Sequence, residues 1–268
     1  MPAKPLFRDP VCTWIDHTEL SDAIAVARDM RGCTRTLAVG PNFFLANGPS
    51  GVRCFFELGI HNVILDLRLL GTPAELWKGV TEAARLGAKG ITLSAFSGPS
   101  ALKIAKEAAV ASQRFTLKVE PIRLLVTMVP DTVQSAELVD DLQLRVKRTG
   151  HVRRVAELVK ELQLDGIVTE FDDTATIWRV SRKISMVVAA QRGPRNYTES
   201  LNEQELEKPG ILECMHANAS HVLLNADLLA RVNVEWAADM VTKELDMLNE
   251  GEGNGTRRYN LSGASLCD

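Results

Sequence analysis

The chain has 268 residues, of which 46% are hydrophobic and 24% are charged, with a formal net charge of −3. This composition excludes a disordered chain, and the slightly negative charge argues against a nucleic-acid-binding protein that depends on a basic surface. Aromatic residues make up only 5%, which disfavours stacking platforms for single strands. The length suits one domain of about 250 residues, as in many barrels.

Membrane spans and secretion signals are not indicated. The sequence has no apolar run of 18 residues, and its first residues lack the apolar segment of a signal peptide. The cysteines are widely spaced and form no Cys-x-x-Cys pair, so we expect neither disulfides nor a zinc site. They are Cys12, Cys33, Cys54, Cys214 and Cys267. We therefore expect a cytoplasmic protein without membrane contact, metal or cofactor.

In chain order, short β-branched runs alternate with longer helical patterns. The first half predicts strands over residues 11–16, 34–40, 62–69 and 90–96, and helices over 21–30, 49–60, 72–86 and 99–112. Ser21 is the expected N-cap of the first helix, with Asp22 in its first turn. Pro73 suits the first turn of the third helix. The run 62–69 is apolar on both faces, which is typical of a buried parallel strand.

The second half continues the alternation. It predicts strands over 123–129, 166–171, 184–190 and 221–225, and helices over 151–164 and 234–248, with a short helix capped by Asp173 or Thr174. Residues 131–150 are expected to form a loop with a helix, and residues 204–219 carry a broken helical pattern. Eight units predict a closed (β/α)8 barrel over 1–248. The alternative is an open doubly wound sheet, and residues 249–268 are expected to be a disordered tail.

Polar residues that end strands face the mouth of such a barrel. Asp66 and Arg68 stand at i and i+2 on one strand, so both face the same way. They are candidates for a catalytic pair or for an internal salt bridge. Asp16, Ser94 and Thr127 are candidate ligand-binding residues, although Asp16 also suits a cap on the amides of residues 18 and 19. Arg192 and Arg195 follow the seventh strand, where barrels often bind phosphate, or form a solvated basic loop.

Two stretches carry a family resemblance. Residues 38–44 read Ala-Val-Gly-Pro-Asn-Phe-Phe, and residues 64–73 read Ile-Leu-Asp-Leu-Arg-Leu-Leu-Gly-Thr-Pro. They resemble the orotidine 5′-phosphate decarboxylase family, which has Lys-Val-Gly on strand two and Leu-Asp-Leu-Lys-x-x-Asp-Ile-Pro on strand three. The similarity is dense from about residue 11 to 100 and thinner, but collinear, to about 245. It implies a barrel that dimerises across its mouth.

In this family one Lys protonates the carbon that loses carbon dioxide, beside alternating Lys and Asp residues. In this resemblance, Asp16 and Asp66 match Asp residues of the family. It places Ala38 where the family has Lys, Arg68 where it has the proton-donating Lys, and Gly71 where it has Asp. After strand eight, residues 225–227 replace a phosphate-binding Gly-Arg.

From these departures we expect a barrel without decarboxylase activity that binds a ligand weakly or serves as a dimeric structural or regulatory protein. The expected partners are a nucleotide or sugar phosphate and a second copy or another protein. The alternatives are a working orotidylate decarboxylase of pyrimidine biosynthesis and a related sugar-phosphate lyase or isomerase.

Overall fold

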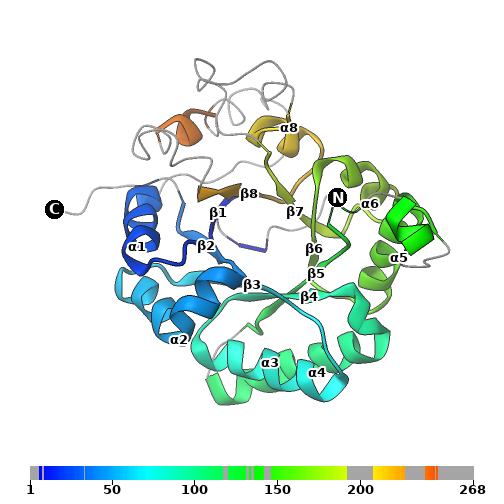
Figure 1. The fold of residues 1–268 in the computed structure, drawn as a ribbon, viewed down its shortest axis with the longest axis horizontal. Coiled ribbons are helices and arrows are strands. Elements are labelled where there is room, and N and C mark those ends of the chain that lie inside the picture. Colours follow the sequence, from blue (N-terminus) through cyan, green and yellow to red (C-terminus); the bar gives the residue numbers. More distant parts are fainter. Residues whose placement is uncertain are drawn as a thin grey trace.

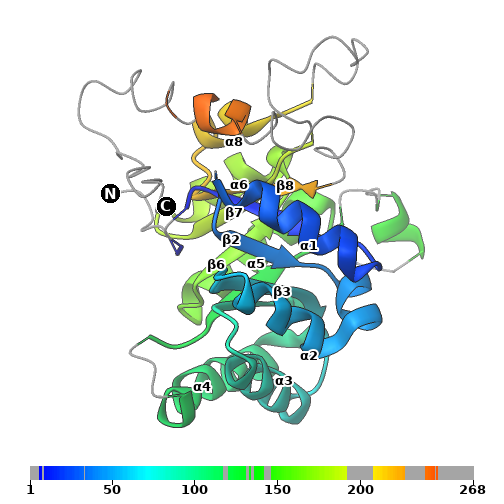
Figure 2. The same ribbon diagram turned by 90° about the vertical axis from the view of Figure 1, so that its left-hand side faces the viewer.

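The computed structural model describes residues 6–7, 9–32, 34–116, 120–130, 133, 136–141, 146–191, 208–226, 239–244 and 246. Eight parallel strands close into a barrel in chain order, and the last strand pairs with the first through Val11–Val222 and Cys12–Leu223 (Figure 1). Helices cover the outside of this barrel (Figures 1 and 2). The predicted (β/α)8 fold is confirmed.

The strands match the predicted runs, most closely at residues 62–69. They are β1 (Val11–Ile15), β2 (Thr36–Val39), β3 (Asn62–Leu69), β4 (Gly90–Ser94), β5 (Arg123–Thr127), β6 (Gly166–Thr169), β7 (Ser185–Ala189) and β8 (His221–Asn225). Each strand is mostly buried on both faces, because one face is covered by helices and the other faces the packed barrel interior.

The helices follow their strands. They are α1 (Leu20–Asp29), α2 (Pro41–Glu57), α3 (Pro73–Leu86), α4 (Gly98–Thr116), α5 (Arg148–Glu161), α6 (Thr174–Val180) and α8 (Ile211–His216). Short turns are η1 (Met30–Gly32), η2 (Ala95–Ser97), η3 (Glu137–Asp141) and η4 (Phe171–Asp173). None of the helices in the described ranges is long and apolar enough to cross a membrane. The predicted tail lies outside the described residues, as does most of the helix expected over 234–248.

Three helix starts differ from the prediction, and one of them is α5, which begins at Arg148 rather than at residue 151. Helix α1 begins at Leu20 with Glu19 as its N-cap, so the prediction of Ser21 as the cap is wrong. The Ser21 hydroxyl instead donates to the Asp22 carboxylate. Helix α2 begins at Pro41 rather than at residue 49, and a kink at Gly48, where φ is 59°, divides it.

Helix α3 has the start that its sequence predicts. The Thr72 hydroxyl accepts a hydrogen bond from the Glu75 amide, and the Glu75 carboxylate accepts one from the Thr72 amide. This reciprocal capping box, followed by Pro73 in the first turn, fixes the point where the chain leaves β3.

The barrel interior is a packed core and not a channel. It is filled by buried Phe7, Cys12, Ala38, Ile64, Leu125 and Val187. Burial, with Asp9 nearby, raises the pKa of the Cys12 thiol, so this cysteine is an inert core residue. A separate and larger core lies between the outer faces of the strands and the helices. Polar chemistry inside the barrel is therefore confined to the carboxyl ends of the strands.

Candidate functional site

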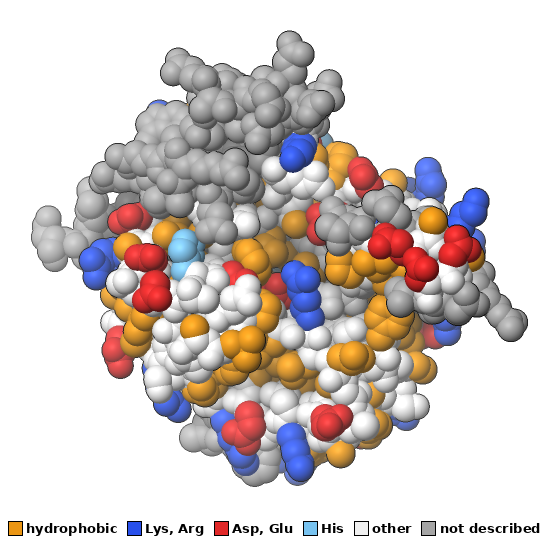
Figure 3. Space-filling model, in the orientation of Figure 1, with side chains coloured by type: hydrophobic (Ala, Val, Ile, Leu, Met, Phe, Trp, Pro, Cys, Tyr) orange, Lys and Arg blue, Asp and Glu red, His pale blue; other side chains and the backbone are white. Residues whose placement is uncertain are grey.

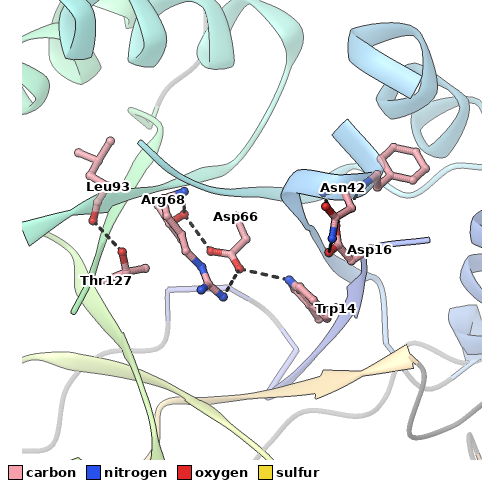
Figure 4. Close-up of polar contacts among 9 residues, drawn as sticks. Trp14, Asp16, Asn42, Asp66, Arg68, Leu93 and Thr127 are labelled. Atoms are coloured by element: carbon pink, nitrogen blue, oxygen red, sulfur yellow. Dashed lines mark hydrogen bonds and ion pairs between the residues drawn. The ribbon is translucent and has the colours of Figure 1, made fainter. Parts of the chain in front are cut away.

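Asp66 is the centre of a polar cluster at the carboxyl end of β3. Its side chain is only 2% exposed. One carboxylate oxygen accepts a hydrogen bond from the Thr92 hydroxyl at 2.9 Å, and the other accepts one from the Trp14 indole nitrogen at 3.2 Å. The Arg68 guanidinium lies 3.5 Å from that second oxygen (Figure 4). The buried carboxylate thus has two neutral donors and one cation as partners.

A backbone irregularity aims Arg68 at this cluster. The pairing of β3 with β4 shifts register between Leu65 and Leu69, and Arg68 has a φ of 49°. Positive φ is uncommon outside glycine, and bulges of this kind redirect side chains beside functional sites. The Arg68 amide donates to the Thr92 hydroxyl oxygen at 2.8 Å, which holds the strained residue in place. The Arg68 side chain remains 52% exposed at the mouth.

Asp16 lies at the mouth, but its carboxylate is already hydrogen-bonded to the start of helix α2. Its carboxylate accepts hydrogen bonds from the Asn42 amide at 2.7 Å, the Phe43 amide at 3.0 Å and the Asn42 side chain at 2.7 Å (Figure 4). These amides belong to the first turn of α2, so Asp16 caps that helix and not the turn at residues 18 and 19. A Cβ on Gly40 would lie 2.3 Å from the carboxylate, so only glycine permits this approach.

The remaining predicted ligand-binding residues also satisfy backbone groups. The Thr127 hydroxyl donates to the Leu93 carbonyl at 3.3 Å, and the Ser94 hydroxyl oxygen accepts from the Phe96 amide at 3.2 Å. Both stand at strand ends, as predicted, but within the described residues neither hydrogen-bonds to Asp66 or Arg68. Arg192 and Arg195 lie outside the described residues, so their predicted role stays a prediction.

Positive charge on the strands themselves is sparse. The eight strands, all within the described residues, contain no lysine, and Arg68 is the arginine that stands near a strand's carboxyl end. Arg148 of α5 also lies beyond β5, but it is paired with Asp173 at 2.6 Å. Ala38 faces the lumen opposite Trp14 and is 2% exposed, so β2 brings no charge there. Figure 3 shows hydrophobic side chains around the centre of the barrel, with acidic and basic side chains among them. The arrangement offers one exposed guanidinium beside one buried carboxylate.

Comparison with known proteins agrees with this architecture. A family model described as "Orotidine 5′-phosphate decarboxylase / HUMPS family" matches residues 9–207. The chain belongs to this family.

Named relatives match most of the chain. An orotidine 5′-phosphate decarboxylase from Syntrophotalea carbinolica is 27% identical over 81% of this chain and 87% of its own length. One from Methylacidiphilum infernorum is 24% identical over 88% of this chain and 96% of its own. Among solved structures, the Lactobacillus acidophilus orotidine 5′-phosphate decarboxylase aligns with a TM-score of 0.71 at 16% identity, covering 88% of this chain and 98% of that one. An uncharacterized conserved protein from Geobacillus kaustophilus aligns with a TM-score of 0.73 at 18% identity, covering 88% and 99%.

The family resemblance described above places Asp66 at the position of the strand-three Asp, and the partners of Asp66 here are Trp14, Thr92 and Arg68. The lysines that the family motif places at positions 38 and 68 are replaced by a methyl group and a guanidinium. Gly71, at the position where the family motif has an Asp, donates its amide hydrogen to the Ser97 hydroxyl oxygen.

Trp14 and Thr92 are site residues that the sequence motifs do not single out. Each lies two residues before a predicted site residue, Trp14 before Asp16 and Thr92 before Ser94. Because side chains alternate between the faces of a strand, this spacing was a usable signal. It was weak, because strands that are buried on both faces give no contrast between inward and outward positions.

Proposed function

We propose that this member of the decarboxylase family binds a phosphorylated ligand, a nucleotide or a sugar phosphate, at the barrel mouth and does not decarboxylate orotidylate. One observation carries the proposal. The Asp66 carboxylate is buried and held by Trp14, Thr92 and Arg68, in a barrel whose strands carry no lysine.

Proton delivery is the step that this site lacks. Decarboxylation in the family ends with a lysine that protonates the carbon left by carbon dioxide. An arginine guanidinium keeps its proton at neutral pH, whereas burial can tune a lysine ammonium to release one. Catalytic groups that act together have non-additive effects on the rate. The combined replacements at 38, 68 and 71 are therefore expected to remove the decarboxylase activity and not merely to reduce it.

Weak anion binding is what the remaining geometry supports. The Arg68 guanidinium is half exposed, and a guanidinium fork suits the oxygens of a phosphate or carboxylate. Its single described ionic contact, to Asp66, is 3.5 Å long, which leaves donors directed at the mouth. Asp66 cancels part of the positive charge, so affinity for an anion is low.

Calorimetric titration with uridine monophosphate and with ribose 5-phosphate tests this binding. We expect saturable binding of at least one of them, lost in Arg68→Gln and retained in the matched surface variant Arg154→Gln. Binding that persists in Arg68→Gln, or none by the unmodified protein, would contradict the proposal.

A working orotidylate decarboxylase is the second candidate. It is favoured by the names of the relatives, which match up to 88% of this chain, and by the retained Asp66 beside a cation. Under this alternative Arg68 or a group outside the described residues delivers the proton. A turnover measurement separates the two candidates.

We also propose a homodimer that meets at the mouth. Leu70 follows β3 and is 69% exposed, and Phe96 follows β4 and is 50% exposed. The Ser97 hydroxyl joins these two loops, since it accepts from the Gly71 amide and donates to the Leu69 carbonyl. An exposed apolar patch of this kind favours association.

A further inference from the structure

A cavity of about 340 Å³ lies outside the barrel, between helices α2 and α3 and the outer face of β3. Figure 1 shows these helices as neighbours over β3. The inner wall is apolar and is formed by Leu65, Leu67, Leu69 and Ile91, with Phe44 and Leu86 at the sides. The cavity is separate from the mouth, because Leu65, Leu67 and Leu69 belong to the outer core while Asp66 faces inward.

Two sequence features leave this space unfilled. Helix α2 is broken at Gly48, where φ is 59° and ψ is −162°, and it restarts at Pro49, which lines the cavity. On the facing side, α3 presents Gly79 and Ala83, the smallest residues available. A Cβ on Gly79 would lie 2.7 Å from the Leu69 side chain, so larger residues there would fill the space. Such an apolar cavity loses van der Waals contacts unless a ligand restores them.

The rim of the cavity is positively charged. Arg53 of α2, and Glu82 and Arg85 of α3, are at its edge. Glu82 and Arg85 form an ion pair with each other. Arg53 is exposed, and no carboxylate within the described part of the chain pairs with it. The rim therefore carries one unbalanced positive charge next to an apolar cavity.

We propose that this cavity binds a single-chain carboxylate of medium length, with its hydrocarbon along Leu65, Leu67 and Leu69 and its carboxylate at Arg53. The volume is at the lower end of the range for small-molecule sites, about 300–1,000 Å³, which suits one short chain and not a two-chain lipid. The unpaired guanidinium selects an anionic head over an alcohol or an amine. This site is independent of the function proposed for the mouth.

Decanoate is the probe for a calorimetric titration, with decanol and decylamine as head-group controls. We expect saturable one-to-one binding of decanoate, weaker binding of decanol and none of decylamine. Arg53→Gln should weaken decanoate binding about fivefold, the upper end of the usual effect of an exposed ion pair. Arg28→Gln, which changes an exposed arginine on α1, should leave it unchanged. Ala83→Phe, which fills the cavity, should abolish it.

A second measurement does not depend on the folding of any variant. In the unmodified protein with ¹³C-labelled Leu and Ile methyl groups, decanoate should shift the signals of Leu65, Leu67, Leu69 and Ile91. Equal binding of decanoate and decylamine, or shifts confined to other methyl groups, would overturn the proposal. The proposal would also be overturned if decanoate did not bind and these methyl signals shifted when the protein is diluted. That result would show that a second copy of the chain covers the cavity.

Discussion

At the scale of single residues, Asp66 is held by the protein itself. A buried carboxylate is costly unless charge and hydrogen bonds compensate it. Thr92 and Trp14 supply neutral donors from β4 and β1, and Arg68 supplies a cation from the solvent side. A carboxylate whose partners all belong to the chain fixes the shape of the mouth, and a substrate would have to displace one of them.

Trp14→Phe tests this view, because it keeps an aromatic ring and removes the indole N–H. We expect a loss of about 1.5 kcal/mol in the free energy of unfolding, since a hydrogen bond to a charged group is removed from a buried site. Urea unfolding measures it. The control Trp77→Phe, on the exposed face of α3, should change stability by less than about 0.5 kcal/mol. Equal effects of the two variants would show that Trp14 does not support Asp66.

His151 predicts a dependence of stability on pH. Its ring stacks on Phe96 at 5.3 Å, and its Nε2 atom is enclosed and has no hydrogen-bond partner among the residues that the structure describes. Burial, then the Arg148 charge, lower the pKa of His151 below the ordinary 6.5, while Asp173 opposes this in part. The unfolded chain therefore takes up the proton first as pH falls below 6.5, so protonation destabilises the fold.

We expect the denaturation midpoint of the protein to fall as pH decreases from 7.5 to 5, and to fall less in His151→Phe, which keeps the stacked ring. His216→Gln, which changes an exposed histidine at the end of α8, serves as the control and should follow the unmodified protein. Parallel curves for the unmodified protein and His151→Phe would show that this ring does not cause the dependence.

At the scale of elements, the segment before β1 closes the amino-terminal end of the barrel. Phe7 is 8% exposed and packs inside the barrel with Cys12 and Ala38. His221 Nε2 accepts hydrogen bonds from the Leu6 and Phe7 amides at 2.9 and 3.3 Å. Because that nitrogen is an acceptor, the ring is neutral, and its Nδ1 donates to the Asp9 carbonyl at 2.9 Å. Residues 6 and 7 thus fill the amino-terminal end of the barrel interior.

Phe7→Ala should reduce the free energy of unfolding by about 3 kcal/mol, the usual cost of removing a buried phenylalanine. Val110→Ala is the control, because this side chain is 53% exposed on the outside of α4, and its effect should be below about 1 kcal/mol. Chemical denaturation compares the two. A cost at Phe7 no larger than that at Val110 would mean that the segment does not stabilise the barrel.

The same scale shows what could be predicted from the sequence. Strand β3 and helix α3 were predicted to the residue or nearly so, because their signals are local: a β-branched run, then Thr-Pro at the start of the helix. The start of α2 was missed because its cap, Asp16, lies 26 residues before Asn42. No local sequence pattern predicts a capping residue that lies so far away along the chain. The pairing of Asp66 with Arg68 followed from strand alternation, whereas the bulge that orients Arg68 has no signature in these residues.

At the scale of the whole molecule, the proposed dimer depends on the loops after β3 and β4. Leu70→Asp places a charge on a residue that is 69% exposed, so the fold should tolerate it. We expect the unmodified protein to be a dimer at tens of micromolar by light scattering, and Leu70→Asp to be a monomer. Val110→Asp, on the outside of α4, should stay dimeric. A monomeric unmodified protein would refute the dimer.

Turnover of orotidylate tests the central claim most directly. The purified protein is incubated with orotidylate, and the fall in its absorbance and the appearance of uridylate are followed. We predict no conversion above the uncatalysed background, and none in Arg68→Lys, because one lysine does not restore the groups replaced at Ala38 and Gly71. Conversion by the unmodified protein that Asp66→Ala abolishes would contradict the claim and show a working decarboxylase built around an arginine.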